Sequence, residues 1–272
     1  MTFSIVARDG DQLGVAVASK FLAVGAFVPA ATAGVGAIAS QSFVNLRYVP
    51  DGFALLADGV PAPESVARLT AADEQRESRQ LGIVDAEGRS GTFTGTTCID
   101  WAGGSCGPGY AAQGNCLAGP EVVDAMEKTF LATQGPLSVR LLTALRAGDD
   151  AGGDRRGRQS AALYVVSPGG GYEGGSDVLV DLRVDDSPTP VAELTRLLGL
   201  HDLYFGTADP DTLLPLSGET GEEVRGLLAA LGRTGEDLDA VLFAWMGWEN
   251  YEERHVPGSI DPVVLAALRQ AS

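Results

Sequence analysis

The sequence contains only two histidines, His201 and His255, and both follow Pro188. The long N-terminal part of the chain therefore has no imidazole to act as a general base, which argues against a Ser-His-Asp or Cys-His catalytic site there. Histidine pairs and compact groups of Asp and Glu with ligand spacing are also missing. We accordingly expect neither a metal ion nor another cofactor.

Cysteine is scarce as well. Cys98, Cys106 and Cys116 are odd in number and are spaced C-x7-C-x9-C, a pattern that fits neither a disulfide framework nor a zinc site. We interpret them as three buried or half-buried thiols, an expectation that includes Cys106. A cysteine amidase using Cys98 or Cys106 is kept as an alternative, although no histidine is at hand to raise the thiolate fraction.

Long apolar runs are absent, because the longest candidate, FLAVGAFVPAATAGVGAIA at 21–39, is broken by Gly, Pro and Thr. We therefore expect a cytoplasmic protein with no membrane partner. With 19 basic and 36 acidic residues, the net charge of -17 disfavours binding to nucleic-acid phosphates. The uncharged run 21–39 is suited to cover either its own core or a partner subunit, and we expect a homo-oligomer.

Acidic residues are concentrated at the C-terminal end of the chain. From Thr207 to Ser272, twelve acidic side chains oppose four arginines, a net charge of 4 - 12 = -8. This asymmetry indicates a second unit. We divide the chain into a large domain at 1–188, a helical linker at 189–206 and a small acidic helical module at 207–272.

Patterning in the large domain alternates strands with helix pairs. TFSIVARD and LGVAVASK, around a GDQ turn, are typical of paired strands, and helical spacing occurs at 48–73 and at 120–148, where Gly148 is expected to end a helix. The pattern of the glycine-rich passage 98–119 predicts neither a helix nor a strand. The order strands, helix pair, strands, helix pair, strands predicts an α+β fold with helical layers on both sides of stacked sheets.

Thr2 is the candidate nucleophile. Its small side chain favours removal of Met1 by methionine aminopeptidase, and the freed α-amine titrates near neutrality within reach of the hydroxyl. Lys20, one of only two lysines, ends the strand expected to pair with the first, so we predict that it tunes the pKa of the amine or hydroxyl. A solvated strand end is the alternative for Lys20.

Two further segments carry side chains suited to binding a substrate. Gln113 and Asn115 carry neutral amides suited to an oxyanion or a substrate, although a plain glycine-rich loop has the same composition. Arg155, Arg156 and Arg158 carry guanidinium groups that bind carboxylates. A solvated turn with internal ion pairs is the alternative for these arginines.

Together these segments resemble the DUF1028 family, uncharacterised proteins of the N-terminal nucleophile (Ntn) hydrolase superfamily. The resemblance spans Thr2 to about Asp186, and the chain from LHDLYFG to IDPVVLAALR resembles an extension of some members that is labelled peptidoglycan-binding-like. The matching stretches include TFSIVARD, LGVAVASKFLAVGAFVP, AGVGAIASQ, NLRY, RQLGIVDAEGR, CIDWAG, GPGYAAQGN, LAGPEVVDAM and GGDRRGRQSAALYVV.

The resemblance implies a four-layer αββα Ntn-hydrolase sandwich followed by a small all-α module, with Thr2 as the nucleophile. The function we infer is hydrolysis of the amide (C–N) bond of a small, carboxylate-bearing substrate, with Thr2, Lys20 and Asn115 as catalytic residues. The alternative is a non-catalytic protein that binds a ligand or partner on the same scaffold.

Overall fold

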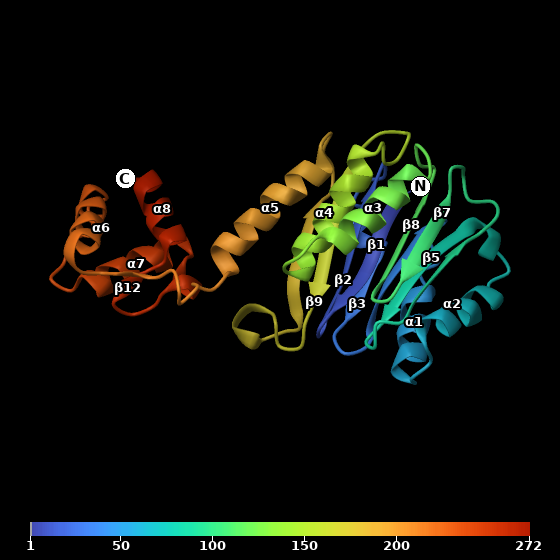
Figure 1. Ribbon diagram of the computed structural model, residues 1–272, viewed down its shortest axis with the longest axis horizontal. Coiled ribbons are helices and arrows are strands. Elements are labelled where there is room, and N and C mark those ends of the chain that lie inside the picture. The colour runs from blue at the N-terminus through green and yellow to red at the C-terminus, as the bar shows by residue number, and fades with distance from the viewer. Residues whose placement is uncertain (1) are drawn as a thin grey trace. The chain divides into compact units, whose positions relative to one another are not determined.

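The computed structural model describes residues 2–272, and its chain divides into two compact units between Arg196 and Leu197. The first unit contains two antiparallel sheets and two pairs of helices (Figure 1). The expected mixture of antiparallel sheets with helices is therefore confirmed. The boundary between the units lies within one continuous helix, α5 (Pro190–Phe205).

The six-stranded sheet has the order β10-β9-β2-β1-β8-β7 and the four-stranded sheet has the order β3-β4-β5-β6. The strands are β1 (Thr2–Asp9), β2 (Gln12–Ser19), β3 (Pro29–Thr32), β4 (Gly36–Ser42), β5 (Arg79–Asp85), β6 (Ser90–Thr94), β7 (Gly103–Gly107), β8 (Tyr110–Asn115), β9 (Ser160–Val166) and β10 (Val178–Val184). The helices of this unit are α1 (Tyr48–Ala57), α2 (Ala62–Ala71), α3 (Glu121–Ala132) and α4 (Leu137–Asp150).

Each sheet has a helix pair on its outer face. Helices α3 and α4 pack on β1, β2, β8 and β9 of the larger sheet, whose other face packs on β4 and β5 (Figure 1). Helices α1 and α2 then cover the outer face of β4, β5 and β6. The order through the first unit is helix pair, six-stranded sheet, four-stranded sheet, helix pair.

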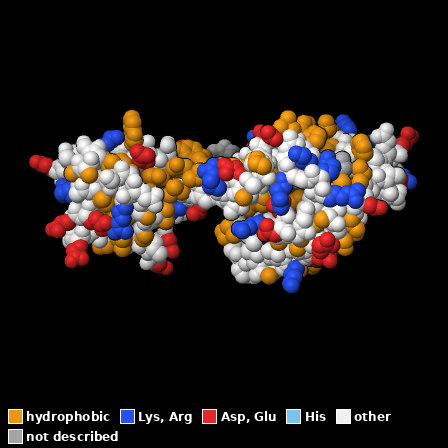
Figure 2. Space-filling model, turned by 90° about the horizontal axis from the view of Figure 1, so that it is seen from above, with side chains coloured by type: hydrophobic (Ala, Val, Ile, Leu, Met, Phe, Trp, Pro, Cys, Tyr) orange, Lys and Arg blue, Asp and Glu red, His pale blue; other side chains and the backbone are white. Residues whose placement is uncertain are grey.

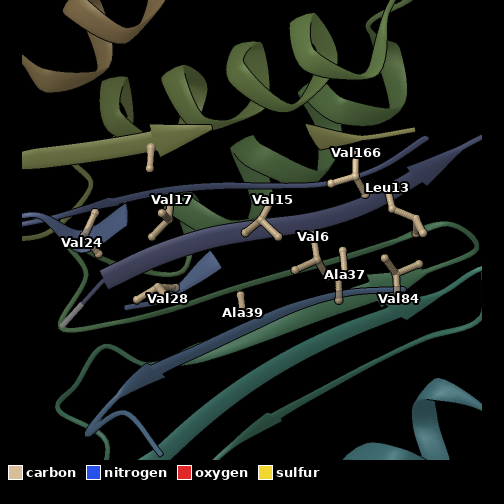
Figure 3. Packing of buried hydrophobic residues seen from close by; sticks show 12 residues of the cluster. Val6, Leu13, Val15, Val17, Val24, Val28, Ala37, Ala39, Val84 and Val166 are labelled. Carbon is tan, nitrogen blue, oxygen red and sulfur yellow. The ribbon is translucent and has the colours of Figure 1, made fainter. Parts of the chain in front are cut away.

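The buried apolar core between the sheets follows from the two-residue alternation along the strands. Val6, Val15 and Val17 of the larger sheet meet Ala37, Ala39 and Val84 of the smaller one, and Figure 3 shows these side chains pointing toward one another. Strand β1 is buried on both faces over its first six residues. Its even-numbered side chains face the smaller sheet, whereas Phe3 lies beside α4.

One local expectation was wrong, and one passage without a prediction contains strands. Helix α4 does not end at Gly148 but continues to Asp150. Packing requires the glycine, because a Cβ atom at position 148 would lie 2.7 Å from Met126 and 3.4 Å from Phe3. The glycine-rich passage 98–119, for which the sequence predicted neither a helix nor a strand, contains β7 and β8.

The second unit is built on α6 (Gly218–Ala230), α7 (Leu238–Glu249) and α8 (Pro262–Ala271). Its core includes Val224, Leu242 and Trp245. A short antiparallel ladder joins β11 (Leu214–Pro215) to β12 (Ser259–Ile260), so an all-α description omits two short strands. No helix within residues 2–272 has the length and apolar character needed to cross a membrane.

Gly82 gives a direct test of how the sheets pack. A Cβ atom at Gly82 in β5 would lie 2.1 Å from Gln113 Oε1 in β8, so Gly82→Ala forces the sheets apart or displaces the Gln113 amide. We expect a loss of about 1–3 kcal/mol in the free energy of unfolding, measured by calorimetry. Gly175→Ala is the control, because Gly175 lies in an exposed loop where the nearest atom is 3.3 Å away. Equal stability of the two variants would contradict this packing.

Candidate functional site

Thr2 begins β1 and lies between two polar residues of the neighbouring strands. The register pairs Thr2 with Ser19 of β2 on one side and with Asn115 of β8 on the other. Directly opposed residues project from the same face of a sheet, and the Thr2 hydroxyl lies 3.1 Å from the Ser19 hydroxyl. Thr2 is 4% exposed. The predicted nucleophile is therefore held at the rim of the space between the two sheets.

Behind Thr2 lies a buried group of polar side chains, here called the amide cluster: Ser4, Gln41, Gln80, Gln113 and Asn115. All five are fully buried. The Ser4 hydroxyl donates to Gln41 Oε1 at 2.7 Å, and Gln113 Nε2 donates to that hydroxyl at 2.8 Å. Gln41 Nε2 in turn donates to Gln80 Oε1 at 2.8 Å. These bonds link β1 and β8 of one sheet to β4 and β5 of the other.

Backbone carbonyls fix the orientation of the amide cluster. Gln80 Nε2 donates to the carbonyl oxygens of Gly114 at 2.7 Å and of Gly103 at 3.2 Å. Since a carbonyl oxygen only accepts, the Nε2 end of Gln80 must face β7 and β8. Gln80 Oε1 therefore faces the other way, where it accepts from Gln41 Nε2 and from Asn115 Nδ2, each at 2.8 Å.

The same constraint orients Asn115. Its Nδ2 donates to Gln80 Oε1 at 2.8 Å and makes a long contact of 3.5 Å with the Thr2 carbonyl oxygen. Asn115 Oδ1 is buried and has no hydrogen-bond partner among residues 2–272. Leaving a buried acceptor unpaired costs about 1–3 kcal/mol. This oxygen next to Thr2 is therefore available to a donor.

A loop carrying three arginines, here called the Arg loop (154–158), approaches the same end of the strands. Its buried carboxylate, Asp154, accepts from the backbone N–H of Lys20 at 3.0 Å and from the guanidinium of Arg156 at 2.8 Å. The backbone of Asp154 also pairs with that of Leu117, just after β8, in an isolated antiparallel β-bridge. One carboxylate thus joins the end of β2 to the start of the loop.

The other cationic side chains are more exposed. Lys20 Nζ donates to the backbone carbonyl of Arg158 at 3.4 Å, and Arg158 Nε donates to both carboxylate oxygens of Asp149, at 2.7 and 2.9 Å. Arg155 is exposed and forms no ion pair with residues 2–272 at contact distance. Arg156 and Arg158 therefore have internal partners, whereas Arg155 is directed to solvent.

Apolar side chains surround this end of the strands. Figure 2 looks down on it and shows Lys and Arg side chains on the first unit with hydrophobic ones around them. Loops that follow β2, β4 and β6 carry exposed apolar residues, namely Phe21, Leu22, Phe27, Phe43, Leu46 and Ile99. Three of these belong to the uncharged run 21–39. A partly apolar surface therefore lies around the cationic residues.

The structure places Asn115 directly opposite Thr2 in the register of β1 and β8. Lys20 follows Ser19, the residue opposite Thr2 in β2; its side chain is exposed and its ammonium donates to the Arg158 carbonyl. Gln113 lies inside the amide cluster, where the Nε2 group donates to Ser4 rather than facing solvent. Sequence reasoning missed Ser19 as a neighbour of Thr2. The register of the first hairpin could have revealed it, because strands joined at a GDQ turn place positions 2 and 19 opposite each other.

A depression of about 770 Å³ lies on the side of α1 and α2, away from Thr2. At its edge, Asp73 accepts hydrogen bonds from Asn45 Nδ2, Tyr48 OH, Arg79 Nε and the backbone N–H of Gln75. Burial by itself raises the pKa of Asp73, but these donors outweigh it and lower the pKa to about 2. Burial and the hydrogen bond to Asp73 raise the pKa of Tyr48. The donors around Asp73 therefore hold its carboxylate in the ionised form.

The thiols and possible metal ligands show no further site. Cys98 and Cys116 are buried as expected, whereas Cys106 is exposed, contrary to the expectation; all three are free cysteines. Both histidines belong to the second unit. Within the part of the chain that the structure describes, no group of three or more His, Cys, Asp or Glu side chains is arranged to hold a metal ion.

The family described as "Family of unknown function (DUF1028)" matches residues 2–194. The crystal structure of protein SPO2555 from Silicibacter pomeroyi, assigned to the same family model, aligns with a TM-score of 0.68 at 29% identity, over 81% of this chain and 88% of that chain. No curated protein sequence matches this chain. The family match contains Thr2, the amide cluster and the Arg loop.

Asp73 provides a pH-dependent test of the hydrogen bonds at the edge of the depression beside α1 and α2. Its carboxyl pKa falls from 3.8 to about 2 in the folded chain, so its ionised form stabilises the fold above about pH 4 and this contribution disappears as the pH falls toward 2. We expect Asp73→Asn to lower the calorimetric melting temperature at pH 7 and to match the unmodified chain near pH 2. Asp51→Asn, in an exposed pair with Arg47, is the control and should change little at either pH. A difference that persists at pH 2 would contradict the assignment.

Proposed function

The chain belongs to the DUF1028 family, and we propose that it is an Ntn-type amidohydrolase that cleaves the C–N bond of a small, carboxylate-bearing amide with Thr2 as nucleophile. The observation that carries this proposal is the placement of Thr2. Its hydroxyl begins a central strand, is nearly buried, and lies 3.1 Å from the Ser19 hydroxyl beside the oriented amide of Asn115.

The order of the layers supports the proposal. Stacking of a helix pair, two antiparallel sheets and a second helix pair is the order expected of an αββα Ntn-hydrolase sandwich. Such a fold serves catalysis by fixing a strand terminus rigidly between its neighbours. Here β1 has β2 on one side and β8 on the other. We infer that removal of Met1 leaves the α-amine of Thr2 at this rigid position.

The proposed reaction has two stages. Thr2 Oγ1 attacks the amide carbonyl carbon while the α-amine of Thr2 takes the hydroxyl proton, and the C–O bond forms as the carbonyl becomes an oxyanion. The oxyanion then collapses, the C–N bond breaks, and the α-ammonium gives its proton to the leaving amine. Water, deprotonated by the same amine, attacks the resulting ester, which releases the carboxylic acid and regenerates Thr2.

Neighbouring groups take supporting roles in this mechanism. Asn115 Nδ2 holds one hydrogen bond to Gln80, and its second hydrogen, with only a long contact to Thr2, is the proposed oxyanion donor. The Lys20 ammonium supplies positive charge at the end of β2. Arg155, exposed on the Arg loop, is proposed to bind the substrate carboxylate. Arg156 and Arg158 could bind the same carboxylate only if each guanidinium group also kept its ion pair, with Asp154 and with Asp149.

The alternative is a binding protein that has the same scaffold but no catalysis. Internal ion pairs of Arg156 with Asp154 and of Arg158 with Asp149 weigh against it, because they occupy two of the three guanidinium groups. The exposed apolar residues Phe21 and Leu22 support the proposal of a homo-oligomer. We also propose that the protein is cytoplasmic and that its substrate is a small molecule.

The first test concerns Thr2 itself. We expect the intact mass of the untagged protein to lack one methionine, and we expect hydrolysis of at least one member of a panel of small N-acyl amino acids and related amides. Thr2→Ala should abolish turnover, since no other hydroxyl has an α-amine as its base, whereas Thr2→Ser should retain part of it. Substrate binding that survives in Thr2→Ala without turnover in any form of the protein would favour the binding alternative.

A second test concerns the oxyanion. Removing one donor from a site of this kind costs on the order of 3 kcal/mol, so Asn115→Ala should lower kcat about a hundredfold. Circular dichroism should show a folded protein, because Gln80 Oε1 keeps Gln41 as a donor in the variant. An unchanged kcat in a folded Asn115→Ala protein would remove Asn115 from the mechanism.

A further inference from the structure

Asn115 Oδ1 is a buried acceptor with no partner among residues 2–272, next to the proposed nucleophile. Its direction is fixed independently of any assumption about catalysis. Two backbone carbonyls orient Gln80 Nε2, the opposite end of Gln80 orients Asn115 Nδ2, and Oδ1 is then the atom that remains. Turning the Asn115 amide over would place two oxygens, Oδ1 and Gln80 Oε1, against each other.

The donor that fits Oδ1 is on the neighbouring strand. Asn115 lies directly opposite Thr2, and its Nδ2 already reaches the Thr2 carbonyl oxygen at 3.5 Å, so the amide lies alongside the backbone of Thr2. The nitrogen of Thr2 has one hydrogen while it is part of a peptide bond. Removal of Met1 converts it to an amine, which has additional hydrogens to donate.

We propose that Asn115 Oδ1 accepts a hydrogen bond from the freed α-amine of Thr2 and thereby positions that amine as the base for Thr2 Oγ1. This inference rests on the proposed function and deepens it. Because the amine must point its lone pair at Oγ1, one of its hydrogens needs a fixed acceptor elsewhere. Asn115 is a positioning residue in this role, and the role is separate from that of Nδ2.

The proposal predicts a change in the titration of the amine. An acceptor stabilises the charged ammonium more than the neutral amine, so its loss lowers the pKa of the amine. The cations Lys20, Arg155 and Arg156 act in the same direction, whereas the carboxylate of Asp154 opposes them; none of these is altered by a substitution at Asn115. The contribution of these charged side chains to the amine pKa is therefore the same in the Asn115 variants and in the unmodified chain.

The experiment uses the full chain with Thr2 as its first residue, produced by cleaving an N-terminal fusion. The chain carries ¹³C-threonine, and the Thr2 signal is assigned by its absence in Thr2→Ser. We expect Asn115→Leu to lower the amine pKa by about half a pH unit or more and Asn115→Asp to raise it. The matched control is Gln113→Leu, two residues further along the same face of β8, which should leave the amine pKa unchanged.

Two results would overturn the inference. One is an unchanged amine pKa in Asn115→Leu, and the other is an equal shift in Asn115→Leu and Gln113→Leu, which would indicate a general effect of disturbing the amide cluster. The titration needs no substrate. Failure to hydrolyse any amide would therefore contradict the proposed function alone, whereas failure of the titration would contradict only the role of Oδ1.

Discussion

The pair of hydrogen bonds from Gln80 to the backbone of β7 and β8 is the constraint on which the site depends. A glutamine buried between two sheets is costly unless both ends of its amide are satisfied. Because Gly103 and Gly114 present fixed carbonyls, one orientation of Gln80 satisfies them. With Gln80 fixed in this way, its Oε1 accepts from the side-chain amides of Gln41 and Asn115, and the Asn115 amide is held beside Thr2, the first residue of β1.

The cost of this polar group explains its surroundings. Two residues beyond Ser4 along β1, from Val6 onward, valine and alanine fill the space between the sheets. They supply the apolar burial that a network of amides lacks (Figure 3). Gly82 leaves the room that the Gln113 side chain needs between the sheets. Outside the cluster, Asp154 joins the end of β2 to the Arg loop by accepting from the backbone N–H of Lys20 and from Arg156.

The sequence predicted those features that depend on neighbours along the chain. The first hairpin, the two helix pairs and the closeness of Thr2 to Lys20 all follow from local periodicity and one tight turn. It did not predict the partners of Gln41 and Gln80, because these meet only when two sheets from separate segments stack. The strands β7 and β8 were missed for a related reason: their glycines, which normally indicate a loop, leave room here for neighbouring side chains such as Leu117.

The central claim is that Thr2 is an activated nucleophile held by the amide cluster. The most direct measurement is covalent labelling of the Met1-free protein with a β-lactone, whose ring opens when a hydroxyl attacks its carbonyl, followed by fragmentation to locate the ester. We expect one adduct, on Thr2, that forms faster than on any other hydroxyl and is absent from Thr2→Ala. Labelling spread over exposed serines and threonines, with Thr2 unmodified in a chain shown to begin at Thr2, would contradict it.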